Sequence, residues 1–136
     1  MVISSKGRYA LRMMLDLAQH DDEGFVSLKS VSQRQEVSLK YMEAIAAMLN
    51  HAGLVQSQRG KEGGYRLSSP ASEITVAKVL HSTEGSLAAV ACLELGESTC
   101  ERADRCLTLP LWKKLDAMMD TYLSGVTVQD LLDGKV

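Results

Sequence analysis

The chain has 136 residues, 46% of them hydrophobic and 24% charged, which is ordinary globular composition for one domain with or without an extension. It contains neither an apolar run long enough to span a bilayer nor the apolar block and cleavage site of a signal peptide, so we expect a cytoplasmic protein with no membrane partner. The net charge of −2 argues at first against a nucleic-acid partner, but residues 1–67 hold nine Lys and Arg against seven Asp and Glu, whereas residues 68–136 hold six against ten.

The first predicted helix begins near Ser4 or Ser5 and reaches about His20, where the sequence DDEG breaks it. Its apolar residues form one broad face, made of Tyr9, Leu11, Met14, Leu15 and Ala18. Lys6, Arg8 and Arg12 fall on the exposed side, where they can touch a DNA backbone or only solvate the surface. Scattered single charges of this kind favour the second interpretation.

Two short helices joined by a tight turn are predicted next, over about residues 28–35 and 39–52. Ser27 and Ser38 can cap them, because a serine hydroxyl accepts from the free amides of a first turn, and Gly53 can end the second helix. On the second helix one side carries Met42, Ile45, Leu49 and Ala52, and the opposite side carries Lys40, Glu43, Ala47 and Asn50. One face is expected to pack and the other to read DNA, as in a helix-turn-helix.

A short basic hairpin follows, with strands predicted over residues 54–58 and 65–68 around the sequence RGKEGG. Gly63 and Gly64 can take the positive φ angles that such a turn needs. Arg59 and Lys61 lie at the tip. A basic hairpin directly after a helix-turn-helix indicates a wing, whose arginine can enter a minor groove or meet phosphates, although in isolation it also fits an ordinary solvated hairpin.

Beyond the wing, a turn at Pro70 leads into a helix capped near Thr75 and ended by Glu84 and Gly85. Its residues Val76, Val79 and Leu80 are expected to be buried.

All three cysteines lie in the polar stretch that comes next: Cys92, Cys100 and Cys106. Core packing disperses cysteines along apolar faces, so this clustering indicates a common use. The spacing is not that of paired CxxC zinc knuckles, and an odd number in a cytosolic chain argues against a disulfide framework. Three thiolates can hold an iron–sulfur cluster or zinc with a fourth ligand from elsewhere, or act as a metal-free thiol switch, and these alternatives stay open. The loop has no histidine; its acidic residues are Glu94, Glu97, Glu101 and Asp104.

A long helix is predicted from Pro110, a residue favoured in a first turn, to about Leu123. Its apolar stripe is wide and consists of Leu111, Trp112, Leu115, Met118, Met119, Tyr122 and Leu123. Because a winged domain is nearly complete without this helix, the stripe predicts a dimer interface built on Trp112, Leu115, Met119 and Tyr122 rather than closure of the monomer core. Gly125 stops the helix, and Thr127 begins a last short one.

Five segments together resemble one family: SSKGRYALRMMLDLA, SLKYMEAI, AGLVQSQRGKEGGYRL, ITVAKVLHSTEG, and the three-cysteine loop followed by LW. They cover essentially the whole chain and resemble the IscR/NsrR/CymR, or Rrf-two, family of winged helix-turn-helix regulators. The resemblance implies a homodimeric bacterial transcription factor whose DNA binding responds to an iron–sulfur cluster (2Fe-2S or 4Fe-4S) or another small effector.

Carried onto this sequence, the resemblance implies major-groove contacts from Ser38, Lys40, Tyr41 and Glu43, wing contacts from Arg59 with Lys61 beside it, and cluster ligands at Cys92, Cys100 and Cys106. Two features depart from the family pattern. IscR-type members have closer first cysteines and a histidine three residues after the last one, where this chain has Leu109. NsrR-type members can use an acidic residue near the partner's N-terminus, where this chain has Arg8. The fourth ligand and the cluster type are therefore unassigned. CymR-type members lack the cysteine triad altogether.

The expected fold is mainly α, a winged helix-turn-helix with a short β-hairpin wing and a long C-terminal dimerisation helix. Residues 1–85 would form the DNA-binding domain, 86–109 the cysteine-containing loop, and 110–136 the dimerisation helix with a short terminal helix. The expected function is binding of operator sites on double-stranded DNA, gated by an iron–sulfur cluster. The signal would be the supply of iron or of clusters, or the redox and nitric-oxide status of the cell. The alternative is a metal- or thiol-based redox protein whose winged domain binds a protein partner. No catalytic constellation is recognisable, so we expect no enzyme.

Overall fold

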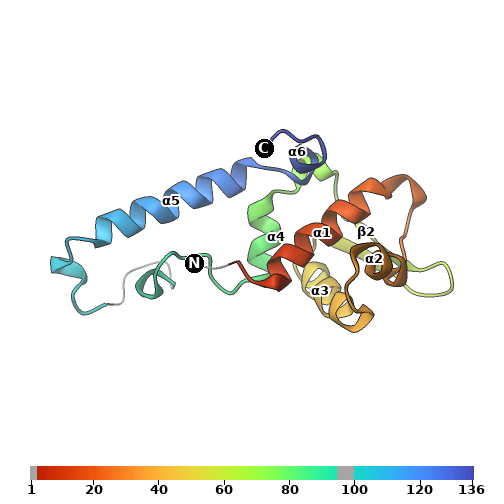
Figure 1. Cartoon of the computed structure of the whole chain (residues 1–136), viewed down its shortest axis with the longest axis horizontal. Coiled ribbons are helices and arrows are strands. Elements are labelled where there is room, and N and C mark those ends of the chain that lie inside the picture. The colour runs from red at the N-terminus through yellow and green to blue at the C-terminus, as the bar shows by residue number, and fades with distance from the viewer. Residues whose placement is uncertain (1–2, 95–99) are drawn as a thin grey trace.

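The computed structural model describes residues 3–94 and 100–136. Within these residues, six α-helices and one antiparallel pair of strands form a compact winged domain from which a single long helix projects (Figure 1). The elements in chain order are α1 (Ser5–Gln19), α2 (Leu28–Gln35), α3 (Leu39–His51), β1 (Val55–Gln58), β2 (Gly64–Leu67), α4 (Val76–Thr83), α5 (Leu109–Gly125) and α6 (Val128–Leu132). The predicted helices and strands are all present, with ends displaced by one or two residues.

Hydroxyl side chains begin five of the six helices. The residues that accept a hydrogen bond from an amide of the first turn are Ser4, Ser27, Ser38, Thr75 and Thr127. For α2, α3, α4 and α6 these are the caps expected from the sequence. The helix starts are local features, since each cap bonds an amide only three residues ahead.

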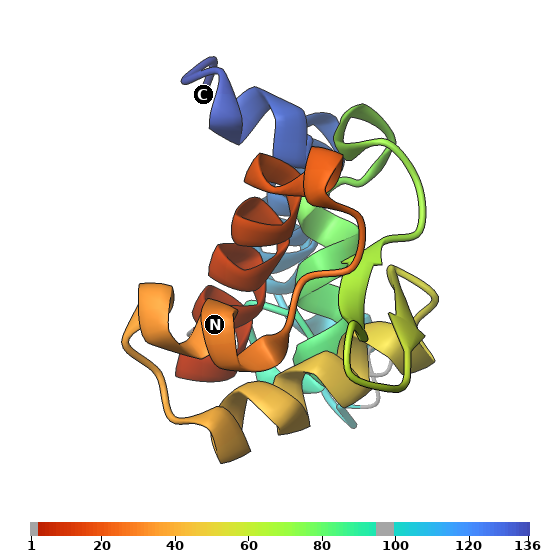
Figure 2. The same ribbon diagram turned by 90° about the vertical axis from the view of Figure 1, so that its right-hand side faces the viewer.

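The core lies where α1, α3 and α4 meet, and Figure 2 shows α3 crossing below α1 and α4. On α3 the predicted apolar residues Met42, Ile45 and Leu49 are fully buried. Ala52 is exposed, contrary to expectation, because the helix ends at His51 and Ala52 is already its C-cap. The packed side of α3 is otherwise as the sequence predicted.

The buried face of α1 is rotated from the predicted one. Its fully buried apolar residues are Ala10, Met13, Met14 and Leu17, of which only Met14 was in the predicted set. The others in that set, Tyr9, Leu11, Leu15 and Ala18, are partly buried and flank the core. Apolar residues surround much of this helix, so its periodicity alone does not determine which side packs.

The wing hairpin is tied to the chain between α1 and α2. Strand β1 pairs with β2, and Tyr65 of β2 exchanges two 2.8 Å backbone hydrogen bonds with Val26. A Cβ on Gly64 would lie 2.1 Å from the Val26 carbonyl oxygen, so glycine is required there. Gly60 and Gly64 have positive φ, whereas Gly63, predicted to share this conformation, does not.

The C-terminal segment returns to the winged domain after α5. Val76 donates a 2.8 Å backbone hydrogen bond to Val126, and Val128 donates one of 2.9 Å to Ile74. Val128 of α6 is fully buried within the core cluster, and α6 packs on α1. The long helix α5 contacts α4 and projects away from the winged domain (Figure 1). In the part of the chain that the structure describes, no helix combines the length and apolar character needed to cross a membrane.

Candidate DNA interface and cysteine loop

The side of α3 opposite the core is exposed along its whole length. Its exposed residues are Lys40, Glu43, Ala44, Ala47 and Asn50, preceded by the exposed cap Ser38. The Ser38 hydroxyl accepts from the amide of Tyr41 at 3.2 Å. The predicted free face of α3 is therefore confirmed as accessible, with charged side chains at its N-terminal end and two alanines that permit close approach of a partner further along.

Tyr41 is the exception among the predicted DNA-contacting residues of this helix, because its ring is partly buried against α1. It meets the ring of Tyr9 edge to face, with centroids 5.8 Å apart and planes at 88°. Its hydroxyl lies 3.4 Å from the hydroxyl of Ser5. Such aromatic pairs favour one relative orientation of two rings, so the position of Tyr41 depends on α1.

One face of α1 holds the whole helix-turn-helix unit. Ser5, Tyr9, Arg12 and Asp16 are spaced four, three and four residues apart and so lie on one side of the helix. Arg12 stacks 4.9 Å above the Tyr9 ring and donates to both the side chain and the backbone carbonyl of Gln35, at the end of α2. Arg12, expected to touch DNA or only solvent, therefore fastens the turn between α2 and α3.

Asp16 is the buried end of this row, with only 1% of its surface exposed. Its carboxylate accepts from the Arg34 guanidinium at 3.0 and 2.7 Å and from the Gln35 amide at 2.9 Å. Burial alone would raise the pKa of Asp16, but these hydrogen bonds and the charges of Arg34 and His20 outweigh it and lower the pKa. Arg34 is thus paired within the protein, a role that sequence spacing did not indicate.

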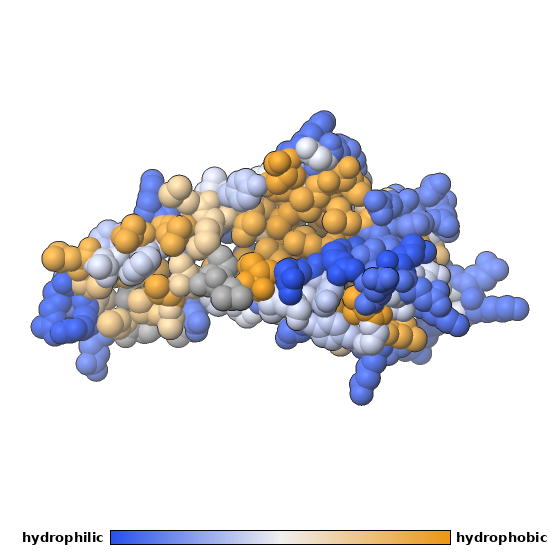
Figure 3. Space-filling model, in the orientation of Figure 1, coloured by the Kyte–Doolittle hydropathy of each residue, from blue (hydrophilic) through white to orange (hydrophobic). Residues whose placement is uncertain are grey.

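The three basic side chains of the wing have different surroundings. Arg66 lies 4.6 Å from the Phe25 ring centroid and donates to Gln56 on the neighbouring strand at 3.1 Å. Arg59 and Lys61 are exposed in the turn at the tip. Figure 3 shows hydrophilic side chains gathered at the wing end of the molecule. All three basic side chains are exposed, but only Arg66 is engaged by a neighbouring ring and strand, whereas Arg59 and Lys61 lie in the turn itself.

Apolar surface gathers instead around α5. Figure 3 shows a large hydrophobic area where the C-terminal part of α5 meets α1 and α4. Four large side chains of α5 are exposed: Leu111, Leu115, Met118 and Tyr122. Trp112 and Met119, also predicted to form a dimer interface, are half-buried. An apolar surface of this extent is typical of a protein–protein contact.

The cysteine loop, residues 86–109, connects α4 to this helix. Cys92 and Cys106 are partly exposed, Cys100 is exposed, and all three thiols are free. The described residues bring together no group of three His, Cys, Asp or Glu side chains able to hold a metal. Glu97 lies outside the described residues. The structure therefore supplies three accessible thiols, the donor type that iron–sulfur clusters require, without an assembled ligand set.

Cys106 lies among groups that favour the thiolate form of its side chain. Its sulfur lies 3.3 Å from the Thr108 hydroxyl, just ahead of α5. Hydrogen bonds from the Thr108 side chain and backbone lower the pKa of Cys106 most. Burial opposes them, and the Leu109 amide and the Arg102 charge contribute smaller lowering effects. A cysteine just ahead of a helix commonly behaves in this way, because the amides of the first turn stabilise the thiolate.

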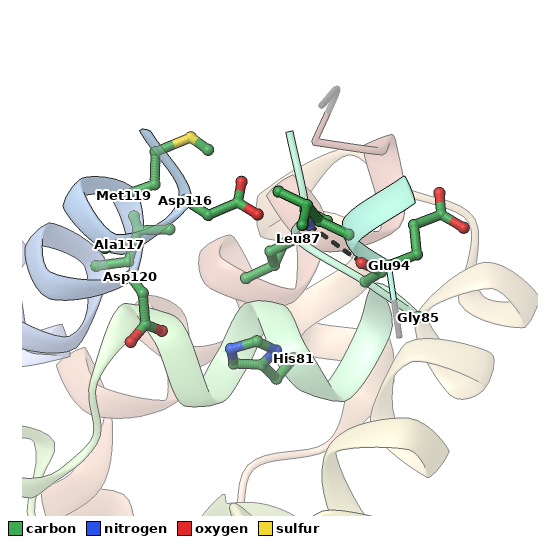
Figure 4. A pocket seen from close by; sticks show the side chains of 12 residues that line it. His81, Gly85, Leu87, Glu94, Asp116, Ala117, Met119 and Asp120 are labelled. Atoms are coloured by element: carbon green, nitrogen blue, oxygen red, sulfur yellow. Dashed lines mark hydrogen bonds between the residues drawn. The ribbon is translucent and has the colours of Figure 1, made fainter. Parts of the chain in front are cut away.

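A cavity of about 520 Å³ lies between the first part of the cysteine loop, α4 and α5 (Figure 4). Asp116 of α5 points towards the loop, and Asp120, one turn further along α5, points towards His81 of α4. Asp116 accepts a 2.7 Å hydrogen bond from the backbone amide of Ala89. The loop is thereby attached to the long helix three residues before its first cysteine.

Comparison with known proteins agrees with this architecture. The sequence model of the Rrf2 family, described as an iron-dependent transcriptional regulator, matches residues 3–134. The chain is 42% identical over 135 residues to the HTH-type transcriptional regulator IscR of Photorhabdus laumondii, covering 99% of this chain and 81% of that protein. These relatives are regulators and not enzymes, as the sequence led us to expect.

Solved structures show the same likeness. T. potens IscR has a TM-score of 0.79 and 36% identity, with 100% of this chain and 89% of that chain covered. CymR, the global cysteine regulator of B. subtilis, has a TM-score of 0.78 and 37% identity, with 96% and 95% covered. The expected mainly α, winged helix-turn-helix fold is confirmed. The chain belongs to the Rrf2 family of winged helix-turn-helix transcriptional regulators.

Proposed function

We propose that this regulator binds operator DNA as a homodimer, with α3 in the major groove and the wing in the flanking minor groove of each half-site. The observation that carries the proposal is the exposed face of α3, with Lys40 and Glu43 at its start, on the same domain as a wing tip that exposes Arg59 and Lys61. Ser38 and Tyr41 complete the proposed contact set. Cationic tips contact phosphates or a narrow groove, while polar side chains on a helix read base edges.

The helix-turn-helix is held firmly on α1, which supports sequence-specific DNA binding rather than binding of a protein partner. Arg12, Asp16 and Tyr9 hold α2, the turn and Tyr41 on α1 through hydrogen bonds, an ion pair and ring packing. Base readout requires side chains held in a fixed register against the duplex. The alanines at 44 and 47 leave the exposed face free of bulky side chains, which suits insertion into a groove.

The second copy of the chain is the proposed occupant of the α5 surface. Leu111, Leu115, Met118 and Tyr122 are between 38% and 60% exposed, so an isolated chain leaves a hydrophobic stripe in water. Burying apolar surface contributes about 25 cal/mol per Å². A two-fold axis passing through this stripe would pair it with itself, and the half-buried Trp112 and Met119 would take part in the same contact.

Cys92, Cys100 and Cys106 are the proposed ligands of an iron–sulfur cluster of the 2Fe-2S or 4Fe-4S type. Their free thiols, the lowered pKa of Cys106 and the iron-dependent description of the family support this. When bound, such a group supplies thiolate–iron bonds that respond to iron supply and oxidation. The chain itself contributes the three thiolates and the attachment of their loop to α5 through Asp116. The fourth ligand is not assigned.

The test starts from protein purified without oxygen, with its visible spectrum recorded and iron and sulfide counted per chain. The same protein is used to select DNA duplexes from a random pool. Its dissociation constant for the enriched site is then measured by fluorescence anisotropy, for cluster-loaded and for cluster-free protein. Two-fold related half-sites, a visible chromophore and a cluster-dependent dissociation constant are expected. Enrichment of no sequence would contradict the operator function, and iron-free, colourless protein would contradict the cluster.

A further inference from the structure

The start of α1 is attached to the end of α4 by the carboxylate of Glu84. Oε1 of Glu84 accepts from the backbone amide of Ser4 at 3.0 Å and from the Ser4 hydroxyl at 2.6 Å. The same hydroxyl accepts from the amide of Gly7 at 3.2 Å, so it caps α1 while donating to Glu84. Two hydrogen bonds to one charged oxygen are stronger than two neutral ones. We refer to these contacts among Ser4, Gly7 and Glu84 as the α1–α4 clasp.

Gly7 makes room for the clasp. It is buried, and a Cβ at this position would lie 2.4 Å from Oε1 of Glu84. Glu84 is a long, flexible side chain, so a methyl group at Gly7 would displace its carboxylate more easily than it would distort the backbone. The glycine inside a helix, otherwise an unfavourable choice, is explained by this close approach.

The first turn of α1 is also the part that positions Tyr41. The residue after Ser4 is Ser5, whose hydroxyl lies 3.4 Å from that of Tyr41. One turn further, the Tyr9 ring packs edge to face on the Tyr41 ring at 5.8 Å. A small displacement of the N-terminal end of α1 would therefore move both contacts of Tyr41 together, because the helix moves as a rigid rod over so few turns.

Glu84 lies at the junction with the cysteine loop as well. It is the C-cap of α4, and its amide donates to the Leu80 carbonyl at 2.8 Å. The exposed Gly85 follows, and the loop begins at residue 86. Five residues after Glu84, Ala89 is attached to Asp116 of α5. Only five residues of chain therefore separate Glu84 from the point where the loop is attached to α5.

We propose that Glu84 is a positioning residue that couples the cysteine loop to the recognition helix, through Ser4 and Ser5 to Tyr41. The inference rests on the proposed function, in which the loop is the sensor and Tyr41 belongs to the DNA-contact set. With the clasp closed, α1 holds Tyr41 in one place; with it open, the end of α1 and Tyr41 gain freedom together. Such an element with two arrangements is what energetic coupling between distant sites requires.

Amide hydrogen exchange on the full chain tests the coupling without DNA or metal. Glu84→Ala removes the acceptor, and Gly7→Ala displaces it while improving intrinsic helix propensity. Each should accelerate exchange by at least about fivefold, the net contribution of a single hydrogen bond, at the first turn of α1 and equally at Tyr41 and Met42 in α3. Glu84→Gln keeps an acceptor oxygen and should have a smaller effect. Glu73→Gln, an exposed carboxylate just ahead of α4, is the matched control and should change neither region.

The distribution of the effect decides the outcome. Faster exchange in α1 with wild-type exchange at Tyr41 and Met42 would overturn the proposal, since Glu84 would then hold only its own neighbours. Uniform acceleration throughout the core would overturn it too, because that indicates global destabilisation. The operator measurement is separate: in Glu84→Ala the difference in affinity between cluster-loaded and cluster-free protein should shrink about fivefold. If wild-type protein shows no operator binding, the proposed function fails, whereas the exchange result still decides the coupling.

Discussion

Arg34 of α2 and Asp16 of α1 form a bidentate ion pair, in which Nε and Nη2 of the arginine donate to the two carboxylate oxygens at 3.0 and 2.7 Å. The carboxylate is almost fully buried, whereas 37% of the arginine side chain is exposed. Such a pair lies between a surface ion pair and a buried one, and removing either partner should cost on the order of 2 kcal/mol. The pair joins α2, the first helix of the helix-turn-helix, to α1 in the centre of the core.

This pair makes stability depend on acid. The folded pKa of Asp16 is lowered, so the unfolded chain takes up a proton before the folded one does as pH falls. The stabilisation is present above the ordinary carboxyl pKa of about 4 and is lost as the pH drops towards the folded pKa. Urea unfolding of wild type and Asp16→Asn should therefore differ most near neutral pH and converge below about pH 4. All other carboxylates are the same in the two proteins, so their titration cancels in the comparison. A difference in the free energy of unfolding that does not change with pH would refute this account.

Arg59 should contribute directly to operator affinity. Arg59→Ala is expected to cost about 1 to 3 kcal/mol per half-site and to make the salt dependence of binding shallower. Titration between about 50 and 200 mM salt would measure both effects. Lys135→Ala, which removes an exposed cation near the C-terminus, is the control and should bind like wild type. Equal affinity of Arg59→Ala and wild type at every salt concentration would argue against a wing contact.

The α5 stripe should control assembly. Leu115→Glu or Met119→Glu places a charge in the proposed interface and should give monomers in sedimentation. Losing the linked second half-site should weaken operator binding by roughly two to four orders of magnitude. Lys113→Glu changes an exposed position of the same helix and should leave the dimer intact. Wild-type protein that sediments as a monomer would rule out this assembly.

The thiols should be needed for the chromophore and not for the fold. Cys92→Ala, Cys100→Ala and Cys106→Ala should each abolish visible absorption, while circular dichroism stays unchanged because none of the three belongs to the hydrophobic core. Leu107→Ala alters a side chain that is 96% exposed beside Cys106 and should keep the colour. A triple variant that still binds iron at the wild-type ratio would exclude the loop as the cluster site.

The wing attachment should tolerate no side chain at Gly64. Gly64→Ala would press a Cβ to 2.1 Å from the Val26 carbonyl and should lower the free energy of unfolding by on the order of 2 kcal/mol. Gly85→Ala has open space around it and should be neutral in the same thermal unfolding assay. Equal melting temperatures for the two variants would show that the wing adjusts freely.

Short-range features of this protein were predictable from its residues. The caps of α2, α3, α4 and α6, the two strands, the packed side of α3 and the exposed polar face opposite it all depend on hydrogen bonds or periodicity within a few residues. The wing and cysteine segments, taken together, also indicated the family. The interactions that determine the caps, the helix faces and the hairpin are made between residues close together in the chain. They can therefore be recognised in the sequence itself.

Tertiary structure alone decided how these parts are joined. Glu84 and Ser4 are 80 residues apart, and Asp16 and Arg34 are 18 apart. Read singly, Glu84 indicated only the end of a helix, and Arg12 only a surface charge. The core face of α1 was misplaced for the same reason, since a helix with apolar residues around much of its circumference buries whichever side its neighbours cover. Pairings between side chains on different elements depend on how those elements pack, and packing is a property of the whole chain rather than of any segment.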